Sequence, residues 1–281
     1  MGNWLKTFLL LGAMTAIIMF FGQILGGQTG LVIAFVIALA LNFFIYWFSA
    51  DMVLAKTRAR VVGVAEAPDL YNLVAHLAQN AGLPTPRVAI VKDPSPNAFA
   101  TGRDPAHAVV AVTSGLLSAM TREELAGVLS HELAHVKHRD ILIGSVAAVL
   151  ASVILFLANM AKFAALFGGR RRGGAGNLVQ ALLLAFLAPL AAALIQAAIS
   201  RSREYLADED GANIAQTPMG LASALEKLQK AALRVGPPRH ATPETASLFI
   251  VNPLSGRSLT ALFATHPPIE ERIQRLRGLR P

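Results

Sequence analysis

Four long apolar segments dominate the pattern of hydrophobic and polar positions along this chain. They cover residues Phe8–Leu25, Leu31–Phe48, Ile141–Met160 and Leu178–Ile199. Each segment is close to the roughly 20 residues that a helix needs to cross the hydrocarbon core of a bilayer. The pattern therefore predicts two transmembrane hairpins, which together form a four-helix bundle.

The two predicted hairpins differ in the charge of their connections. The first turn, Gly26–Gly30, is uncharged, whereas Lys6 precedes that hairpin and Lys56 and Arg58 follow it. Basic residues favour the cytoplasmic side, so both ends of the first hairpin are predicted to face the cytoplasm. The second connection carries basic residues 170–172, which oppose this orientation. Either the first hairpin fixes the topology, or the second hairpin enters the bilayer without crossing it fully.

Between the hairpins the pattern changes to that of a small α+β domain. Pro68–Ala81 has apolar residues at helical spacing and ends before Gly82, which predicts a helix. Thr121 and Glu124 form a capping-box pattern, which predicts the start of another helix. Strands are predicted for segments rich in β-branched residues and for the short segment between them, namely residues 87–93, 97–102 and 107–117.

This order of segments predicts one polar domain that the second hairpin interrupts. Residues 1–50 form the first hairpin and residues 141–199 the second. Residues 51–140 and 200–281 are the two parts of the polar domain. Its second part is predicted to end in a basic amphipathic helix that begins at Pro267 and Pro268, with apolar residues on one face. The predicted fold class is α+β and mostly helical, with the polar domain at the cytoplasmic face of the bundle.

Composition supports a membrane protein and excludes other classes. Of the 281 residues, 54% are hydrophobic and only 15% are charged, which is too apolar for an ordinary soluble globule. The 25 basic and 17 acidic residues leave a net charge of +8, which we interpret as loops held at a cytoplasmic membrane face. No nucleic-acid recognition motif accompanies this charge, so nucleic acid is not an expected partner. Without cysteine, a zinc site would need histidine and carboxylate ligands.

The candidate chemistry lies in the stretch SHELAHVKHRD. It places His131 and His135 four residues apart, with Glu132 beside the first. Residues four apart share a face of a helix, so both imidazoles can bind one ion, and zinc is the metal that this ligand type suits. Glu132 can then reach a water molecule as a general base. A chance match on an ordinary polar helix is the alternative, and the capping box that begins this helix argues against it.

A catalytic zinc site needs a third protein ligand, and the stretch SRSREYLADEDGA offers one. Glu204 and Asp208 are four residues apart on the predicted helix that follows the last apolar segment. Glu204 can complete the ligand set, and Asp208 can orient a ligand histidine. An ordinary charged helix next to a membrane is the alternative. However, the two ends of one hairpin lie on the same side of a bilayer, which brings Glu204 near His131.

Four motifs, NAFATG, HELAH, SRSREYLAD and THPP, are arranged around apolar hairpins. In this the chain resembles the family of membrane zinc endopeptidases that contains HtpX and the CAAX prenyl endopeptidase. The resemblance covers essentially the whole chain. It implies a gluzincin-like protease domain with one zinc ion per subunit, held by His131, His135 and Glu204, and with Glu132 as the catalytic residue.

The resemblance also implies a biological setting. It implies quality control of membrane proteins in a bacterial inner membrane, under stress, with polypeptide substrates and an active site that faces the cytoplasm. By similarity, an edge strand formed by Asn97, Ala98, Phe99 and Ala100 aligns an extended substrate by main-chain pairing; an ordinary hairpin strand is the alternative. His266 matches a position that gates the metal site or stabilises the developing oxyanion; otherwise it only precedes a helix. The oligomeric state stays open.

Two other functions compete with that of a quality-control protease. One is a zinc-bound membrane chaperone or assembly factor without turnover, against which the intact Glu132 argues. The other is a prenyl-protein endopeptidase of the same family. Four apolar segments are too few for the larger helical chamber of such enzymes, which disfavours this alternative. The sequence therefore favours a zinc-dependent integral-membrane endopeptidase.

Overall fold

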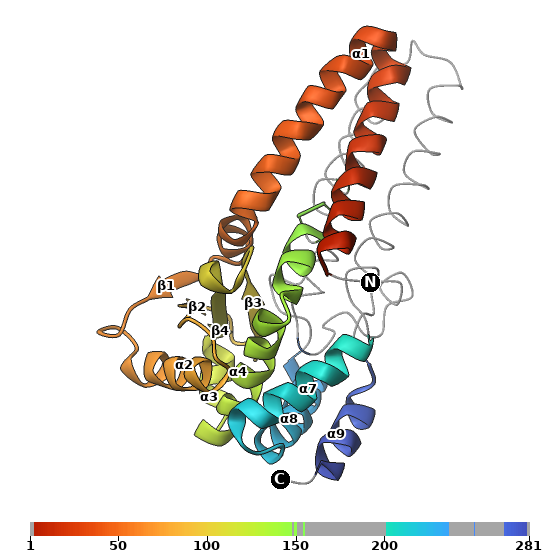
Figure 1. Ribbon diagram of the computed structural model, residues 1–281. Helices are drawn as coiled ribbons and strands as arrows, with labels where there is room; N and C mark the ends of the chain where they lie inside the picture. Colours follow the sequence, from red (N-terminus) through yellow and green to blue (C-terminus); the bar gives the residue numbers. More distant parts are fainter. Residues whose placement is uncertain are drawn as a thin grey trace.

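A computed structural model describes residues 3–147, 149–150, 154, 201–235, 250 and 267–279. Its helices are α1 (Asn3–Thr57), α2 (Pro68–Asn80), α3 (Ser114–Ala119), α4 (Arg122–Lys137), α7 (Arg201–Ala215), α8 (Met219–Val235) and α9 (Ile269–Gly278), with a 3₁₀ turn at Pro105–His107. Its strands are β1 (Arg60–Val62), β2 (Arg87–Val91), β3 (Ala98–Thr101) and β4 (Val109–Thr113). The fold is α+β and mostly helical, and α1 projects away from the other labelled elements (Figure 1).

Several predicted segments lie wholly or largely outside the described residues. The second hairpin is described only at residues 141–147, 149–150 and 154, all of which are helical. The connector that follows α8 is described only at Ile250, and His266 is not described. The four-helix bundle and the role of His266 therefore stay predictions.

Helix α1 is a hairpin of two legs. The backbone leaves helical geometry at Gly26 (φ −139°, ψ 15°) and at Gly27 (φ 57°, ψ −144°), within the predicted turn. Beside the turn the legs touch through their backbones, because a Cβ atom on Gly22 would lie 2.5 Å from the carbonyl oxygen of Gly30. A Cβ atom on Gly30 would lie 2.2 Å from the carbonyl oxygen of Gly22. Small residues thus allow the close approach that helix pairs in lipid depend on.

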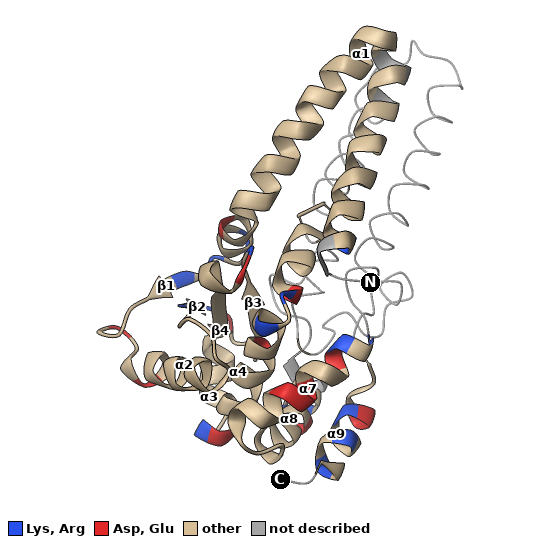
Figure 2. Ribbon diagram, viewed as in Figure 1, with Lys and Arg blue, Asp and Glu red and all other residues tan. Residues whose placement is uncertain are grey.

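The second leg, Gly26–Thr57, is long and apolar enough to cross a membrane, and the first contains the shorter apolar helix Leu5–Phe20. Only 17% of the most apolar part of the second leg is buried inside the structure, so its side chains face outward. Charged residues gather below the hairpin and are almost absent along it (Figure 2). The helix continues beyond the apolar segment that ends at Phe48, through charged residues as far as Thr57.

The four strands form one sheet in the order β1-β2-β4-β3. Strands β2 and β4 are parallel, whereas β1 and β3 pair with them in the antiparallel direction. The predicted strands are confirmed, except that residues 114–117 belong to helix α3. That helix begins because the Thr113 side chain accepts a hydrogen bond from the Leu116 N–H (3.1 Å). Strand β1 was not predicted, because three residues carry too little alternation to be recognised.

Helix α4 is the centre of the helical layer and packs against α7, α8 and β3. Glycines permit its closest contacts. A Cβ atom on Gly211 of α7 would lie 3.0 Å from the Cα atom of His131, and one on Gly127 would lie 2.3 Å from the backbone nitrogen of Leu221 in α8. The backbone of α7 therefore lies against the motif of α4, which determines where Glu204 can reach.

The predicted capping box begins α4 and also ties it to α8. The Thr121 side chain accepts from the Glu124 N–H, and the Glu124 carboxylate accepts from the Thr121 N–H (2.8 Å). Ser223 and Lys227 of α8 donate to the same carboxylate, each at 2.7 Å. Burial alone would raise the pKa of Glu124, but these hydrogen bonds and the charge of Lys227 lower it to about 2. The buried carboxylate is therefore ionised and satisfied at neutral pH.

Candidate metal and active site

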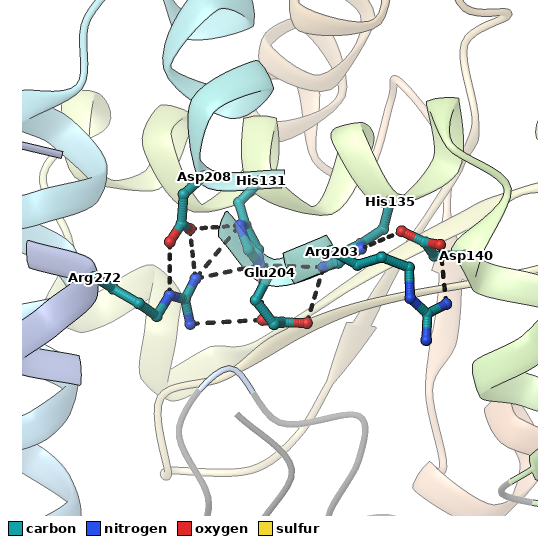
Figure 3. A network of polar contacts seen from close by, with 7 residues as sticks. All are labelled: His131, His135, Asp140, Arg203, Glu204, Asp208 and Arg272. Atoms are coloured by element: carbon teal, nitrogen blue, oxygen red, sulfur yellow. Dashed lines mark hydrogen bonds and ion pairs between the residues drawn. The ribbon is translucent and has the colours of Figure 1, made fainter. Parts of the chain in front are cut away.

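The two histidines of the motif meet on one face of α4, as their spacing predicts. Their Nε2 atoms are 3.2 Å apart, and the rings meet edge to face with centroids 4.7 Å apart. His131 is 2% exposed and His135 is partly buried. Figure 3 shows both side chains directed to the same space, between α4 and the acidic residues that follow the second predicted hairpin.

Glu204 of α7 reaches this space from the other side. Its carboxylate oxygens lie 3.8 Å from Nε2 of His131 and 3.6 Å from Nε2 of His135. One ligand atom from each of the three residues lies within 4.8 Å of the other two. Two imidazoles and a carboxylate at such distances are a donor set that fits a catalytic zinc ion. The structure therefore brings the three predicted ligands together, and their role as ligands stays a prediction.

The other nitrogen of each imidazole faces an aspartate. Nδ1 of His131 lies 2.9 Å from Asp208, and Nδ1 of His135 lies 3.1 Å from Asp140. Since carboxylates accept, each ring donates from Nδ1, which leaves Nε2 as the atom that can bind a metal. Both Nε2 atoms face the carboxylate of Glu204, and Nη2 of Arg272 also lies 3.4 Å from Nε2 of His131.

Each of these aspartates is held by an arginine. Arg272 of α9 donates from Nε (2.8 Å) and Nη2 (2.6 Å) to Asp208, and its Nη1 lies 3.8 Å from Glu204. Arg203 donates to Asp140 at 3.1 Å. Burial alone would raise the pKa of Asp208, but Arg272 lowers it to about 2. With Glu132 and Glu204, the site holds four carboxylates against two guanidinium groups. This excess of acidic groups in a buried site favours the binding of a cation.

The remaining acidic residues of α7 lie away from the ligand group. Glu209 is exposed. Asp210 lies 2.5 Å from Nε2 of His138 and 3.7 Å from the Lys137 ammonium. Asp208, by contrast, is 3% exposed and lies against His131. The helical spacing of Glu204 and Asp208 thus separates them from the two carboxylates that follow.

Arg272 was missed in the sequence, where the last helix was interpreted only as basic and amphipathic. It is fully buried, at 0% exposed. A signal was present, because Arg272 lies three residues after Ile269 and four before Leu276, on the apolar stripe itself. A cation on such a stripe needs a buried anion as its partner. Asp140 and Arg203 had no comparable signal.

Glu132 is placed for proton transfer. Its carboxylate is 6% exposed and accepts a hydrogen bond from the backbone N–H of Ala100 in β3. Burial, with a further contribution from the charge of Glu204, raises the pKa of Glu132 to about 7 although His135 opposes this. A carboxyl group with a pKa near the working pH can both take up and release a proton. Glu132 therefore has the proton affinity that the predicted general base requires.

Strand β3 lies at the edge of the sheet beside α4, and within the described residues it pairs with β4 alone. Asn97, Ala98 and Phe99 are buried, and Ala100 is partly buried. The side-chain oxygen of Asn97 accepts from the Ile250 N–H at 3.2 Å. Because these side chains are largely covered, what this edge offers a peptide is mainly its backbone.

A model of peptidase family M48 matches residues 64–280 of this chain. The chain belongs to peptidase family M48. Members of M48 are zinc metalloproteases, so the predicted enzyme class, a peptide hydrolase of the metalloprotease type, is confirmed. The resemblance drawn from the four sequence motifs is confirmed as well.

M48 relatives match this chain over nearly its whole length. A Protease HtpX homolog of Desulfatibacillum aliphaticivorans is 55% identical over 288 residues, which cover 100% of this chain and 91% of the relative. A Protease HtpX homolog of Thermococcus kodakarensis is 54% identical over 278 residues, which cover 98% and 96%. The crystal structure of S. mikatae Ste24p matches 98% of this chain with a TM-score of 0.52 and 17% identity. This chain spans 65% of that protein, and the likeness shows a shared fold.

Proposed function

We propose that this M48 metalloprotease is a zinc-dependent integral-membrane endopeptidase that cleaves misfolded or damaged membrane proteins. One zinc ion per chain is held by His131, His135 and Glu204. The observation that carries the proposal is the convergence of their donor atoms within 4.8 Å, next to the buried Glu132. The apolar hairpin above this site and the HtpX homologs among the relatives support a substrate in the membrane.

The residues of the chain divide the work of hydrolysis. A zinc ion at the three donors would act as a Lewis acid. It would lower the pKa of water, so that the water can lose a proton and attack near neutral pH. Glu132 takes the proton of the attacking water on its carboxylate and delivers it to the leaving amine. Asp208 fixes the tautomer of His131 so that Nε2 faces the metal. Arg272 keeps Asp208 ionised for this purpose.

The substrate lies along β3 in an extended conformation. Residues Asn97–Ala100 present a strand edge to it, and main-chain pairing aligns the scissile bond beside Glu132. Recognition through the backbone is largely independent of sequence, which suits an enzyme that removes many different damaged proteins. His266 acts nearby, as a gate or as a donor to the developing oxyanion.

The enzyme is a multi-pass protein of the bacterial inner membrane, with its active site at the cytoplasmic surface. Its domain organisation is a protease domain in two parts, 51–140 and 200–281, around the hairpins 1–50 and 141–199. After Lys137 the chain turns and continues at Asp140 as a helix into apolar residues 141–147, which supports a metal site close to the bilayer. Basic residues on either side of α1 support the orientation.

Labelling of single cysteines tests this orientation, and the natural absence of cysteine gives no background. Lys92→Cys and Glu123→Cys, both exposed in the protease domain, are expected to react only from the cytoplasmic side. Gln28→Cys, exposed at the turn of α1, is the matched position and is expected to react only from outside. A membrane-impermeant maleimide added to intact cells distinguishes cysteines on the outer side of the membrane from those on the cytoplasmic side. Labelling of position 92 or 123 in intact cells would reverse the proposed topology.

No specific observation favours either of the two competing functions, the assembly factor or the prenyl-protein endopeptidase. An assembly factor without turnover has no need of a carboxyl group with a raised pKa beside the metal donors, yet Glu132 has one. The likeness to Ste24p is one of fold at 17% identity, so it does not favour a prenylated substrate. The membrane-protein substrate is therefore the one we retain.

Comparison of membrane proteomes tests the substrate class. In cells under heat or envelope stress, integral-membrane proteins are expected to accumulate with Glu132→Gln in place of the wild type. Their fragments should be present only with the wild type. Accumulation confined to soluble or prenylated proteins would instead support another substrate class.

A further inference from the structure

A buried chain of contacts runs from His135 to Asp140 and on to Arg203 (Figure 3). Nδ1 of His135 lies 3.1 Å from Oδ2 of Asp140, and Arg203 donates to Oδ1 of the same carboxylate at 3.1 Å. The three side chains are 16%, 9% and 15% exposed. We propose that Asp140, held by Arg203, is the positioning residue of His135. This inference rests on the proposed metal site and deepens it.

The backbone makes a special turn to bring Asp140 to His135. In an uninterrupted helix, residues five apart point about 140° away from each other, so Asp140 would face elsewhere. Instead α4 ends at Lys137, and Arg139 adopts a left-handed conformation (φ 59°) with its N–H bonded to the Val136 carbonyl at 3.1 Å. The helix begins again at Asp140. This conformation is unfavourable for a residue other than glycine, so the turn at Arg139 is a specific feature of the fold.

The arrangement repeats that of the other histidine. His131 donates from Nδ1 to Asp208, which Arg272 holds, as His135 donates to Asp140, which Arg203 holds. In both cases Nε2 faces Glu204. A carboxylate at Nδ1 fixes the tautomer and the ring orientation of a metal-binding histidine and raises its basicity. Both predicted histidine ligands are thus oriented by an aspartate that an arginine supports.

The carboxylate of Asp140 also couples two of the predicted metal ligands. One of its oxygens faces His135, and the other accepts from Arg203, which directly precedes Glu204 in α7. Asp140 and Arg203 are 63 positions apart. The contact therefore holds the first turn of α7 against the end of α4 and sets the distance between Glu204 and His135. The alternative is that the Arg203–Asp140 ion pair only holds the two helices together, and that the contact of Asp140 with the imidazole has no effect on the metal site.

Metal binding by Asp140 variants separates positioning from mere rigidity. Asp140→Ala is expected to lower zinc affinity about 10–100-fold, measured by competition with a chromophoric chelator. It should also shift the visible absorption bands of the cobalt-substituted protein, which report ligand geometry. Asp140→Asn keeps a hydrogen-bond acceptor of the same size for Nδ1 of His135. Its zinc affinity and its cobalt spectrum are therefore expected to lie between those of Asp140→Ala and those of the wild type. Arg203→Gln should give a smaller loss than Asp140→Ala. The matched control, Asp210→Asn, removes a carboxylate that contacts His138 and should change neither readout.

Each outcome decides the inference. Wild-type zinc affinity and an unchanged cobalt spectrum in folded Asp140→Ala would overturn it and leave the proposed function intact. If Asp140→Ala does not fold, Asp140→Asn decides, because an affinity and a spectrum equal to those of Asp210→Asn would overturn the positioning role. A wild-type protein that binds neither zinc nor cobalt would overturn the proposed function and this inference together.

Discussion

Replacement of Glu132 by glutamine is expected to lower peptide cleavage by several orders of magnitude while zinc stays bound. The amide has the size of the carboxyl group but cannot take a proton from water. Loss of general base catalysis alone costs roughly 10²–10⁴-fold. The loss is larger here because the same group also delivers the proton to the leaving amine. Neither imidazole nor Glu204 is changed, so the metal donors stay in place.

The measurement is cleavage of an unfolded protein substrate by purified, zinc-loaded enzyme, with zinc content determined on the same samples. Glu123→Gln is the matched control, because it removes a carboxylate from the exposed first turn of the same helix. That variant should cleave like the wild type. Near-normal cleavage by zinc-loaded Glu132→Gln would show that another group transfers the proton.

Glu204→Ala is expected to abolish retention of zinc. Removal of a direct ligand leaves two imidazoles and also removes a negative charge from a buried site that contains two arginines. Asp208→Ala should only weaken binding, by about 10–100-fold, because Asp208 orients His131 without touching the metal. The structure supports this ranking, since the Asp208 carboxylate faces Nδ1 of His131 and Glu204 faces Nε2.

Metal analysis of the purified variants at equal protein concentration tests this ranking. Glu209→Ala is the matched control on α7, since Glu209 is exposed and lies one residue beyond Asp208. It should retain zinc like the wild type. Tightly held, stoichiometric zinc in Glu204→Ala would mean that another residue is the third ligand.

Local periodicity made much of the site predictable. His131, Glu132 and His135 lie on one helix, and both their spacing and the capping box that begins the helix at Thr121 are visible in the sequence. Glu204 followed from one further constraint, that both ends of a hairpin lie on one side of a bilayer. In the structure, α7 does lie close to α4, with Gly211 against the backbone of His131.

The supporting residues could not be derived in the same way. Asp140 reaches His135 only because Arg139 takes a left-handed conformation, which no composition rule indicates for arginine. Arg203 meets Asp140 across 63 positions, so their contact depends on tertiary packing. Arg272 was recognisable as a cation on an apolar stripe, but its partner Asp208 was not. Contacts that depend on tertiary packing therefore cannot be predicted from a sequence pattern that describes one helix or strand at a time.

Titration of metal-stripped wild-type protein with zinc tests the central claim most directly, with cleavage of an unfolded membrane protein measured at each addition. The account predicts no cleavage without metal and a rate that rises with bound zinc up to one ion per chain. Glu132→Gln, titrated in parallel, should bind the same amount of zinc and remain inactive. Cleavage by zinc-free wild-type protein, or no cleavage with one zinc ion bound per chain, would contradict the account.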